Sequence, residues 1–230
     1  MADIVVYGNP VSPFVRKVEV VLTSQGVDYD LERINNMVMP DWFLEISPAR
    51  RIPVLRDRSV GTVGRAGTIA DSSAICAYLD AKFNAGLYGD NPFDTGRAIW
   101  LEEYADTELA QPTGMQLFRP IVFPRIAGKE SDLDTARKTW RETLPRHFDY
   151  LESALDGNAY FVGGRFSIAD IAVGAQMTQL DLVAGPPDSG LWPALVRHTR
   201  AMKERTGFAE NLAACRDVLG RFVPEPLDLS

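Results

Sequence analysis

The sequence has few of the residues that build disulfide frameworks or serine–histidine catalytic pairs. Its 230 residues include two cysteines, Cys76 and Cys215, and two histidines, His147 and His198. The cysteines lie far apart in helical patterns, which argues against a disulfide framework and fits a reducing, cytoplasmic location. Both histidines fall on expected helices in the second half of the chain, where neither is placed to activate a serine.

Long apolar runs and strongly basic stretches are also missing. No apolar run reaches the ~18 residues of a membrane span. The chain starts directly with a strand-like run, without the basic region and cleavage site of a signal peptide. The net charge of −7 argues against a nucleic-acid partner. Any anion site must therefore be made locally.

The order of apolar patterns predicts two domains, an α/β domain at residues 1–84 and an all-helical domain at residues 92–230. In the first, strand patterns occupy residues 4–7, 29–34, 52–56 and a run ending at 69, and helices begin at 12–13 and 71. In the second, helical patterns occupy residues 97–118, 133–155, 167–182, 192–205 and 208–219. Pro145 should kink the second of these helices, and the tail from Pro224 should be loosely held.

A proline turn and a helix start about twenty residues later predict a site for a small anionic peptide. Pro53 precedes a buried strand and is a candidate for the cis isomer. The backbone N–H and C=O of Ile52 would then lack sheet partners and could grip an extended ligand by strand-like pairing. The helix that opens at Asp71 and Ser72 offers free N–H groups and a positive dipole end, which suit a carboxylate.

Ser12 is the candidate catalytic residue. A serine before Pro13 at a helix start is more often only an N-cap. Its hydroxyl could also stabilise a bound thiolate. A free thiol has a pKa of ~8.5, and lowering it by two units needs about 2.7 kcal/mol. One charge-assisted hydrogen bond, worth ~1.5–3 kcal/mol, could supply most of that.

Three further polar clusters have structural alternatives. Arg50 and Arg51 could supply positive charge beside the proline turn, or could be solvated surface residues. Arg16 and Lys17 could add to the same positive electrostatic field, or their side chains could face water. Ser167 and Asp170 form a capping box, which we interpret as the nucleus of a central helix.

Four stretches together resemble the cytosolic glutathione S-transferases. They are residues 7–18 (YGNPVSPFVRKV), 47–55 (SPARRIPVL), 71–79 (DSSAICAYL) and 163–171 (GGRFSIADI). The Ser-Pro-Phe at 12–14 is similar to the serine-type classes and closest to the plant tau pattern. The resemblance implies a thioredoxin-like N-terminal domain, an all-helical C-terminal bundle and a homodimer.

The resemblance also implies a detoxifying transferase that conjugates the glutathione thiolate to a small hydrophobic electrophile. Ser12 matches the thiol-activating hydroxyl, and Tyr7 is the alternative because other classes keep a catalytic tyrosine at the end of the first strand. Glutathione would be held by Arg51 at its glycyl end, by Ile52 beside Pro53 at its cysteinyl part, and by Asp71 and Ser72 at its γ-glutamyl end. The resemblance implies no metal.

Two departures from the family pattern leave other functions open. Asp71 stands where the family has Glu or Gln, and Met37-Val38-Met39 stands where tau proteins carry a lysine. The alternatives are a glutathione-dependent isomerase or peroxidase, and a non-catalytic binding protein with the transferase fold. We expect the electrophile to lie along residues 104–125.

Overall fold

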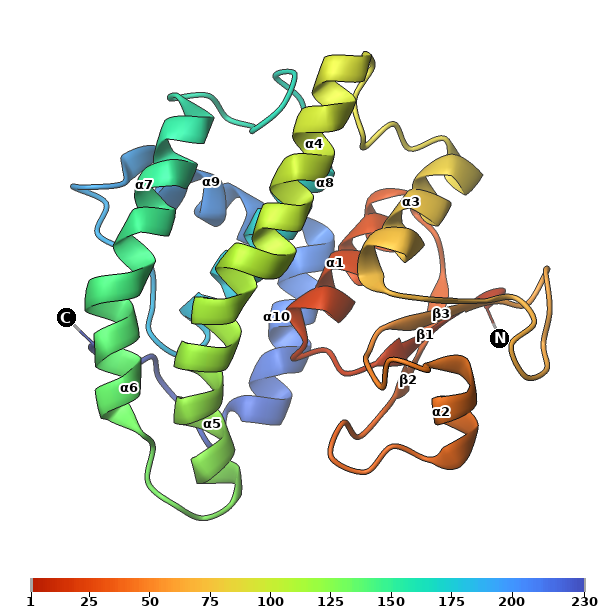
Figure 1. The fold of residues 1–230 in the computed structure, drawn as a ribbon, viewed down its shortest axis with the longest axis horizontal. Helices are drawn as coiled ribbons and strands as arrows, with labels where there is room; N and C mark the ends of the chain where they lie inside the picture. Colours follow the sequence, from red (N-terminus) through yellow and green to blue (C-terminus); the bar gives the residue numbers. More distant parts are fainter. Residues whose placement is uncertain (1, 230) are drawn as a thin grey trace.

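The computed structural model describes residues 2–229, in which a four-stranded sheet is followed by a helical bundle (Figure 1). The strands are β1 (Ile4–Gly8), β2 (Tyr29–Arg33), β3 (Val54–Asp57) and β4 (Thr68–Ala70), in the order β2-β1-β3-β4. β1 is parallel to β2 and antiparallel to β3, and β4 is antiparallel to β3. The expected strands are therefore present, and they form one mixed sheet.

Three helices accompany the sheet: α1 (Pro13–Ser24), α2 (Asp41–Ile46) and α3 (Ser72–Phe83). α1 begins after the Ser12 cap with a proline at its first position, and the chain leaves it through Gly26 at φ 64°. Figure 1 shows α1 between α3 and the C-terminal helix α10 (Thr206–Leu219). It packs against α3, α8 (Ile168–Asp181) and α10, so it joins the two halves of the molecule.

The second half contains helices and, within the described residues, no strand apart from an isolated bridge between Val162 and Arg165. A long helix runs through α4 (Pro92–Tyr104), the π-helical segments η1 (Ala105–Leu109) and η2 (Gln111–Phe118), and α5 (Arg119–Ile126). A second runs through α6 (Leu133–Lys138), the π-helical segment η3 (Thr139–Thr143) and α7 (Leu144–Leu155). α8, α9 (Pro193–Lys203) and α10 complete the bundle.

The helix expected at residues 97–118 is longer at both ends. It begins at Pro92 because Asn91 caps it, its side chain accepting hydrogen bonds from the N–H groups of Phe93 and Asp94 at 3.0 Å. The second long helix departs from regular α-helical geometry next to Pro145, since the π-helical turn η3 ends two residues before it. A proline cannot donate the helical hydrogen bond, and a widened turn accommodates the missing bond.

α8 forms the centre of the bundle. Every residue from Ile168 to Leu180 is buried. The capping box is present, because the Ser167 N–H and hydroxyl both donate to Asp170 Oδ2, at 2.9 and 2.8 Å. This confirms the structural interpretation of the pair. Among residues 2–229 no helix is long and apolar enough to cross a bilayer.

The expectation of a loosely held tail is wrong. The Leu227 N–H donates to the Val183 carbonyl at 2.7 Å, and Leu229 is only 2% exposed. These two leucines have apolar surface to bury, and the segment after α8 offers the carbonyl of Val183 as a hydrogen-bond acceptor. The local sequence, which is rich in proline and acidic residues, gave no sign of that partner.

Candidate functional site

The register of the sheet brings the predicted site segments to one end. Tyr7, Val54 and Ala70 are neighbours in one row across β1, β3 and β4. Pro53 immediately precedes this row and Asp71 immediately follows it, while the loop to α1 leaves β1 at the same end. Segments that lie far apart in the sequence therefore meet at one edge of the sheet.

The backbone at Ile52 is free, as the sequence predicted. The Ile52–Pro53 peptide bond is cis. Within residues 2–229, the N–H and C=O groups of Ile52 make no hydrogen bond. The preceding residue is fixed, since the Ser47 hydroxyl accepts from the Arg51 N–H at 3.0 Å and donates to the Arg51 carbonyl at 2.7 Å. A rigid, unpaired peptide edge of this kind can pair with an extended ligand.

The start of α3 has free hydrogen-bonding groups. Asp71 is the N-cap, at φ 89°, and its Oδ1 accepts from the N–H groups of Ser73 and Ala74 at 2.9 and 3.2 Å. The N–H and the hydroxyl of Ser72 have no partner in the described part of the chain, although Ser72 is only 4% exposed. These donors and the helix dipole suit a carboxylate, and Asp71 keeps one oxygen outside the cap.

Ser12 caps α1 only weakly. Its Oγ accepts from the Val15 N–H at 3.4 Å, a long hydrogen bond. Pro13 has no N–H, and the Phe14 N–H has no acceptor among residues 2–229. The hydroxyl hydrogen of Ser12 is not committed to any of these residues. A hydroxyl donor and a free N–H at a helix start can stabilise an anion such as a thiolate.

Tyr7, the alternative to Ser12, is engaged elsewhere. Its ring makes edge contacts with Trp42 and Phe43 of α2, with centroids 5.5 and 6.4 Å apart. Its hydroxyl accepts from Arg56 Nε at 3.3 Å. Arg56 also donates to the carbonyls of Gly64 and Ala66, both at 2.7 Å. Tyr7 thus helps to hold the loop before β4, and the geometry favours Ser12.

Arg16 and Lys17 do not face water, contrary to one of the two expectations. Both are fully buried. Lys17 Nζ donates to Ser73 Oγ at 3.0 Å and to Glu102 Oε1 at 2.9 Å, and it is paired with Asp106. Burial alone would lower the pKa of Lys17, but the surrounding acidic groups outweigh it and raise the pKa, so the charge is kept. The two carboxylates neutralise this charge, which therefore adds little to the field of the site.

The arginines before the proline turn are exposed. Arg50 adopts a left-handed conformation at φ 54°. Within the described residues the Arg51 side chain makes no hydrogen bond or ion pair, and only its backbone is held, by Ser47. Its guanidinium is free to approach a ligand carboxylate.

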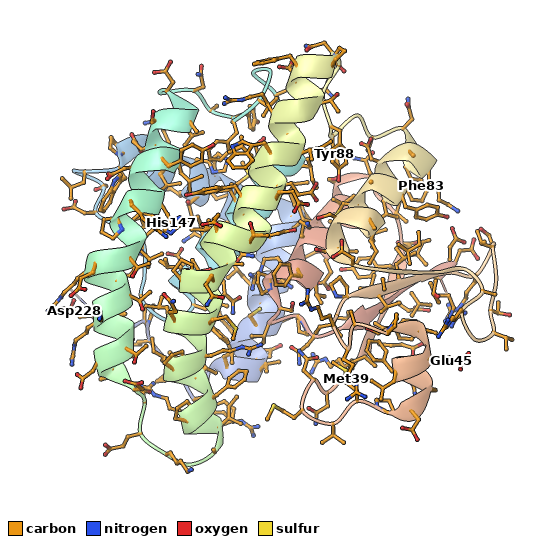
Figure 2. All side chains as sticks on the ribbon, in the orientation of Figure 1. Met39, Glu45, Phe83, Tyr88, His147 and Asp228 are labelled. Carbon is orange, nitrogen blue, oxygen red and sulfur yellow. The ribbon has the colours of Figure 1, made fainter. Side chains whose placement is uncertain are left out.

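The long helix carries apolar side chains suited to an electrophile. Met115 and Phe123 are 45% and 41% exposed, whereas Phe118 is buried. Tyr104 instead faces α7, with its hydroxyl 2.7 Å from Nδ1 of His147, which is labelled in Figure 2. Burial lowers the pKa of His147. Tyr104 and His147 therefore join two helices.

Three residues that bind Arg16 and Lys17 were not predicted from the sequence: Asn211, Glu102 and Asp106. Asn211 lies inside α10, where asparagine is a poor helix former. That mismatch was the only local signal. The two acidic residues gave none, because charged residues on a helix usually face water.

Two family models match this chain. Residues 6–89 match the model described as "Glutathione S-transferase, N-terminal domain", and residues 100–201 match "Glutathione S-transferase, C-terminal domain". The chain belongs to the glutathione S-transferase family. It is similar to glutathione S-transferase D6 of Drosophila melanogaster, with 27% identity over 213 residues, 90% of this chain and 91% of the relative.

Solved structures show the same fold. A glutathione S-transferase from Rhodospirillum rubrum superposes with a TM-score of 0.80 at 24% identity, covering 91% of each chain. FzlA from C. crescentus superposes with a TM-score of 0.81 at 24% identity, covering 92% of each chain. The thioredoxin-like N-terminal fold and the helical C-terminal fold are thereby confirmed. The closeness to the tau pattern is not confirmed, because identities this low do not separate the classes. Members of the family use glutathione as a co-substrate.

Proposed function

We propose that this protein is a glutathione transferase that activates the thiol through Ser12. Residues 1–84 form the glutathione-binding domain, and residues 92–230 form the helical domain that holds a small hydrophobic electrophile against the bound thiolate. The Ser12 hydroxyl donates a hydrogen bond to the sulfur and favours its ionised form. The thiol proton leaves to water. The thiolate sulfur then forms a bond to the electrophilic carbon while the bond from that carbon to its leaving group breaks, and the leaving group keeps the electron pair.

One observation carries this proposal: four sets of unpaired donors and acceptors meet at one end of the sheet. The free backbone at Ile52 would pair with the cysteinyl part of glutathione. The Ser72 donors would bind the γ-glutamyl carboxylate, and the free oxygen of Asp71 would bind the γ-glutamyl ammonium. Arg51 would approach the glycyl carboxylate. The Ser12 hydroxyl is then available to the sulfur.

Glutathione binding, measured by calorimetry, tests the socket. We expect wild type to bind, and both Asp71→Ala and Asp71→Asn to lose about 1–2 kcal/mol of binding free energy. Asp71→Asn is the matched control because it keeps the oxygen that caps α3 and removes only the charge. Full affinity in the asparagine variant would show that Asp71 acts as a cap and does not contact the ligand.

Ser12→Ala tests the chemistry. Loss of one charge-assisted hydrogen bond should raise the pKa of the bound thiol by about 1–2 units and lower kcat about 10- to 100-fold, with glutathione affinity nearly unchanged. Ser12→Thr keeps the hydroxyl and should retain most of the activity. The thiol pKa is read from the pH dependence of thiolate absorbance in the binary complex. Equal thiol pKa values in wild type and the alanine variant would remove Ser12 from the mechanism.

A second candidate is a binding protein that keeps the fold without catalysis. One oxygen of Asp71 caps α3, and the aspartate side chain is shorter than the Glu or Gln of the family pattern, so it reaches less far toward a ligand. This favours the binding protein without catalysis. A curated relative named FtsZ-localized protein A, from Caulobacter vibrioides, is 24% identical over 179 residues, 77% of each chain. Failure of wild type to bind millimolar glutathione would favour this candidate over the transferase, isomerase and peroxidase activities.

We also propose that the protein is a cytoplasmic homodimer. Exposed apolar side chains on α4, Phe93 at 76% and Ile99 at 44%, support a surface that pairs with a second copy. Light scattering coupled to size exclusion should give twice the chain mass of 25.4 kDa. A single-chain mass at working concentration would refute the dimer.

A further inference from the structure

The loop that carries Ser12 is held partly from the far end of the chain. The loop joins β1 to α1, and two of its hydrogen bonds are internal: the Ser12 N–H donates to the Asn9 carbonyl at 2.9 Å, and the Val11 N–H donates to Asn9 Oδ1 at 3.1 Å. Pro10 is buried, and its carbonyl accepts no hydrogen bond from within the loop among the described residues. That carbonyl accepts from Asn211 Nδ2 at 3.0 Å.

Asn211 also holds the first turn of α1. Its Oδ1 accepts from Arg16 Nε at 2.6 Å. The Arg16 N–H in turn donates to the Ser12 carbonyl at 3.0 Å. One amide on α10 therefore binds a group two residues before Ser12 and a group four residues after it.

Asn211 is fixed in this orientation by its other contacts. Its Nδ2 also donates to Glu19 Oε2 at 2.6 Å, and Tyr29 donates to the other oxygen of Glu19 at 3.1 Å. Cys215, one turn later on α10, donates through Sγ to the Pro10 carbonyl at 3.2 Å and lies 3.4 Å from Asn211 Oδ1. Asn211 is 4% exposed, and both Arg16 and Cys215 are fully buried. Turning the amide around would set donor against donor at Arg16, so the contacts allow one orientation.

We propose that Asn211 is a positioning residue for Ser12, so that the helical domain sets the thiol-activating geometry of the other domain. The inference rests on the proposed function, because it concerns how accurately the Ser12 hydroxyl is directed at the sulfur. A buried carbonyl that loses its partner shifts or admits water. If the Pro10 peptide moves, the cap residue Ser12, which lies two residues after it, also moves. The charge-assisted hydrogen bond from Ser12 to the sulfur is sensitive to such a change in geometry.

The test replaces the donor and keeps the acceptor. Asn211→Asp retains an oxygen for Arg16 and removes both N–H donors. It is made in a Glu19→Gln background, so that two carboxylates do not face each other, and Glu19→Gln alone is the control. Relative to this control, Asn211→Asp should raise the pKa of enzyme-bound glutathione by about one unit and lower kcat about tenfold, with KM for glutathione within about twofold.

A double-mutant cycle with Ser12→Ala separates positioning from general structural damage. If Asn211 acts through Ser12, Asn211→Asp should leave the thiol pKa unchanged when Ser12 is already alanine. The same shift with and without Ser12, or no shift in either background, would overturn the inference. If Ser12→Ala itself leaves the thiol pKa unchanged, the proposed function fails, and the positioning role fails with it.

A second pair decides the case if the Asn211 variant does not fold. Cys215→Ser keeps a donor to the Pro10 carbonyl, whereas Cys215→Ala removes it. The alanine variant should raise the thiol pKa and lower kcat about twofold relative to the serine variant. Identical thiol pKa values in the two variants would overturn the inference.

Discussion

Replacing Lys17 with methionine should destabilise the protein by about 3–5 kcal/mol at pH 8, because it leaves a buried carboxylate without its cation. Methionine has nearly the same length as lysine, so little packing is lost. Lys17 is fully buried and donates to Ser73, Glu102 and Asp106. The side chain of Glu102 is only 3% exposed, and that of Asp106 is 12% exposed. Asp106 can relax toward water, so most of the cost falls on Glu102.

Glu102 would keep one partner in the variant, the hydroxyl of Tyr88 at 3.1 Å. Figure 2 shows Tyr88 after α3 and beside α4. Burial already raises the pKa of Glu102, and Lys17 opposes that shift. Without Lys17 the pKa should rise further, so that the folded variant binds a proton more tightly than the unfolded chain. The penalty is therefore absent below the unfolded pKa of about 4.3 and grows as the pH rises through the folded pKa.

Thermal unfolding followed by circular dichroism between pH 5 and 8 measures this effect. At pH 8 the variant should melt roughly 6–20 °C below wild type, since 1 kcal/mol shifts Tm by about 2–4 °C in a chain of this size. The difference should shrink toward pH 5. Adding Glu102→Gln to Lys17→Met should restore most of the stability at pH 8, because no ionised Glu102 is then left unpaired.

Three results would refute this reasoning. They are a loss below about 1 kcal/mol at pH 8, a loss that is constant between pH 5 and 8, and a double variant that is no more stable than Lys17→Met. Any of them would mean that water reaches Glu102 in the variant and that Lys17 contributes little beyond its hydrocarbon stem.

Two further buried carboxylates give predictions. Asp57 is paired with Lys82 and accepts from the Tyr78 hydroxyl at 2.6 Å. Burial alone would raise the pKa of Asp57, but these hydrogen bonds outweigh it and lower the pKa, so its stabilisation is present above the unfolded pKa of about 3.9 and is lost as the pH falls below it. Asp57→Asn should cost about 2–3 kcal/mol at pH 7 by urea unfolding. The cost should begin to fall near pH 3 and should continue to fall at lower pH, and a pH-independent cost would contradict this. Asp170→Ala should cost about 3–5 kcal/mol, because Asp170 accepts from Ser167, from the N–H of Phe161 and from His198. Ser167→Ala should cost only about 1 kcal/mol in the same assay, and equal costs would contradict a central role for Asp170.

The site could be predicted in outline because its parts carry local signals. Proline at 53, a serine–proline helix start at 12–13 and an aspartate–serine helix start at 71–72 each restrict the backbone within a few residues. These three segments meet at one edge of the sheet because the strands next to them pair with one another. The order of the elements along the chain made this pairing the simplest arrangement. The cap of α8 was predictable for the same reason, since Ser167 and Asp170 act within one turn.

The surroundings of the site could not be predicted locally. Trp100 is an apolar residue inside an expected helix, yet it is 52% exposed, and its indole N–H donates to the hydroxyl of Tyr150. Leu229 lies in the tail that was expected to be loosely held, yet it is buried, and Leu227 of the same tail donates to the Val183 carbonyl after α8. In both cases the deciding neighbour lies tens of residues away, and helical periodicity says nothing of which distant surface covers which face.

The sequence by itself determined where elements start, where the chain turns and which backbone groups are free, because caps and prolines act over a few bonds. Only the tertiary structure decided whether a charged side chain is exposed to water or buried with compensating partners. Arg16 and Lys17 follow the Ser12 cap by one turn and would be solvated on an isolated helix. They are buried because α1 packs against the helical half of the molecule, which supplies Glu102, 85 residues away from Lys17, and Asn211, 195 residues away from Arg16. Burying a charge is favourable only where partners compensate for its lost hydration, and folding alone brings those partners together.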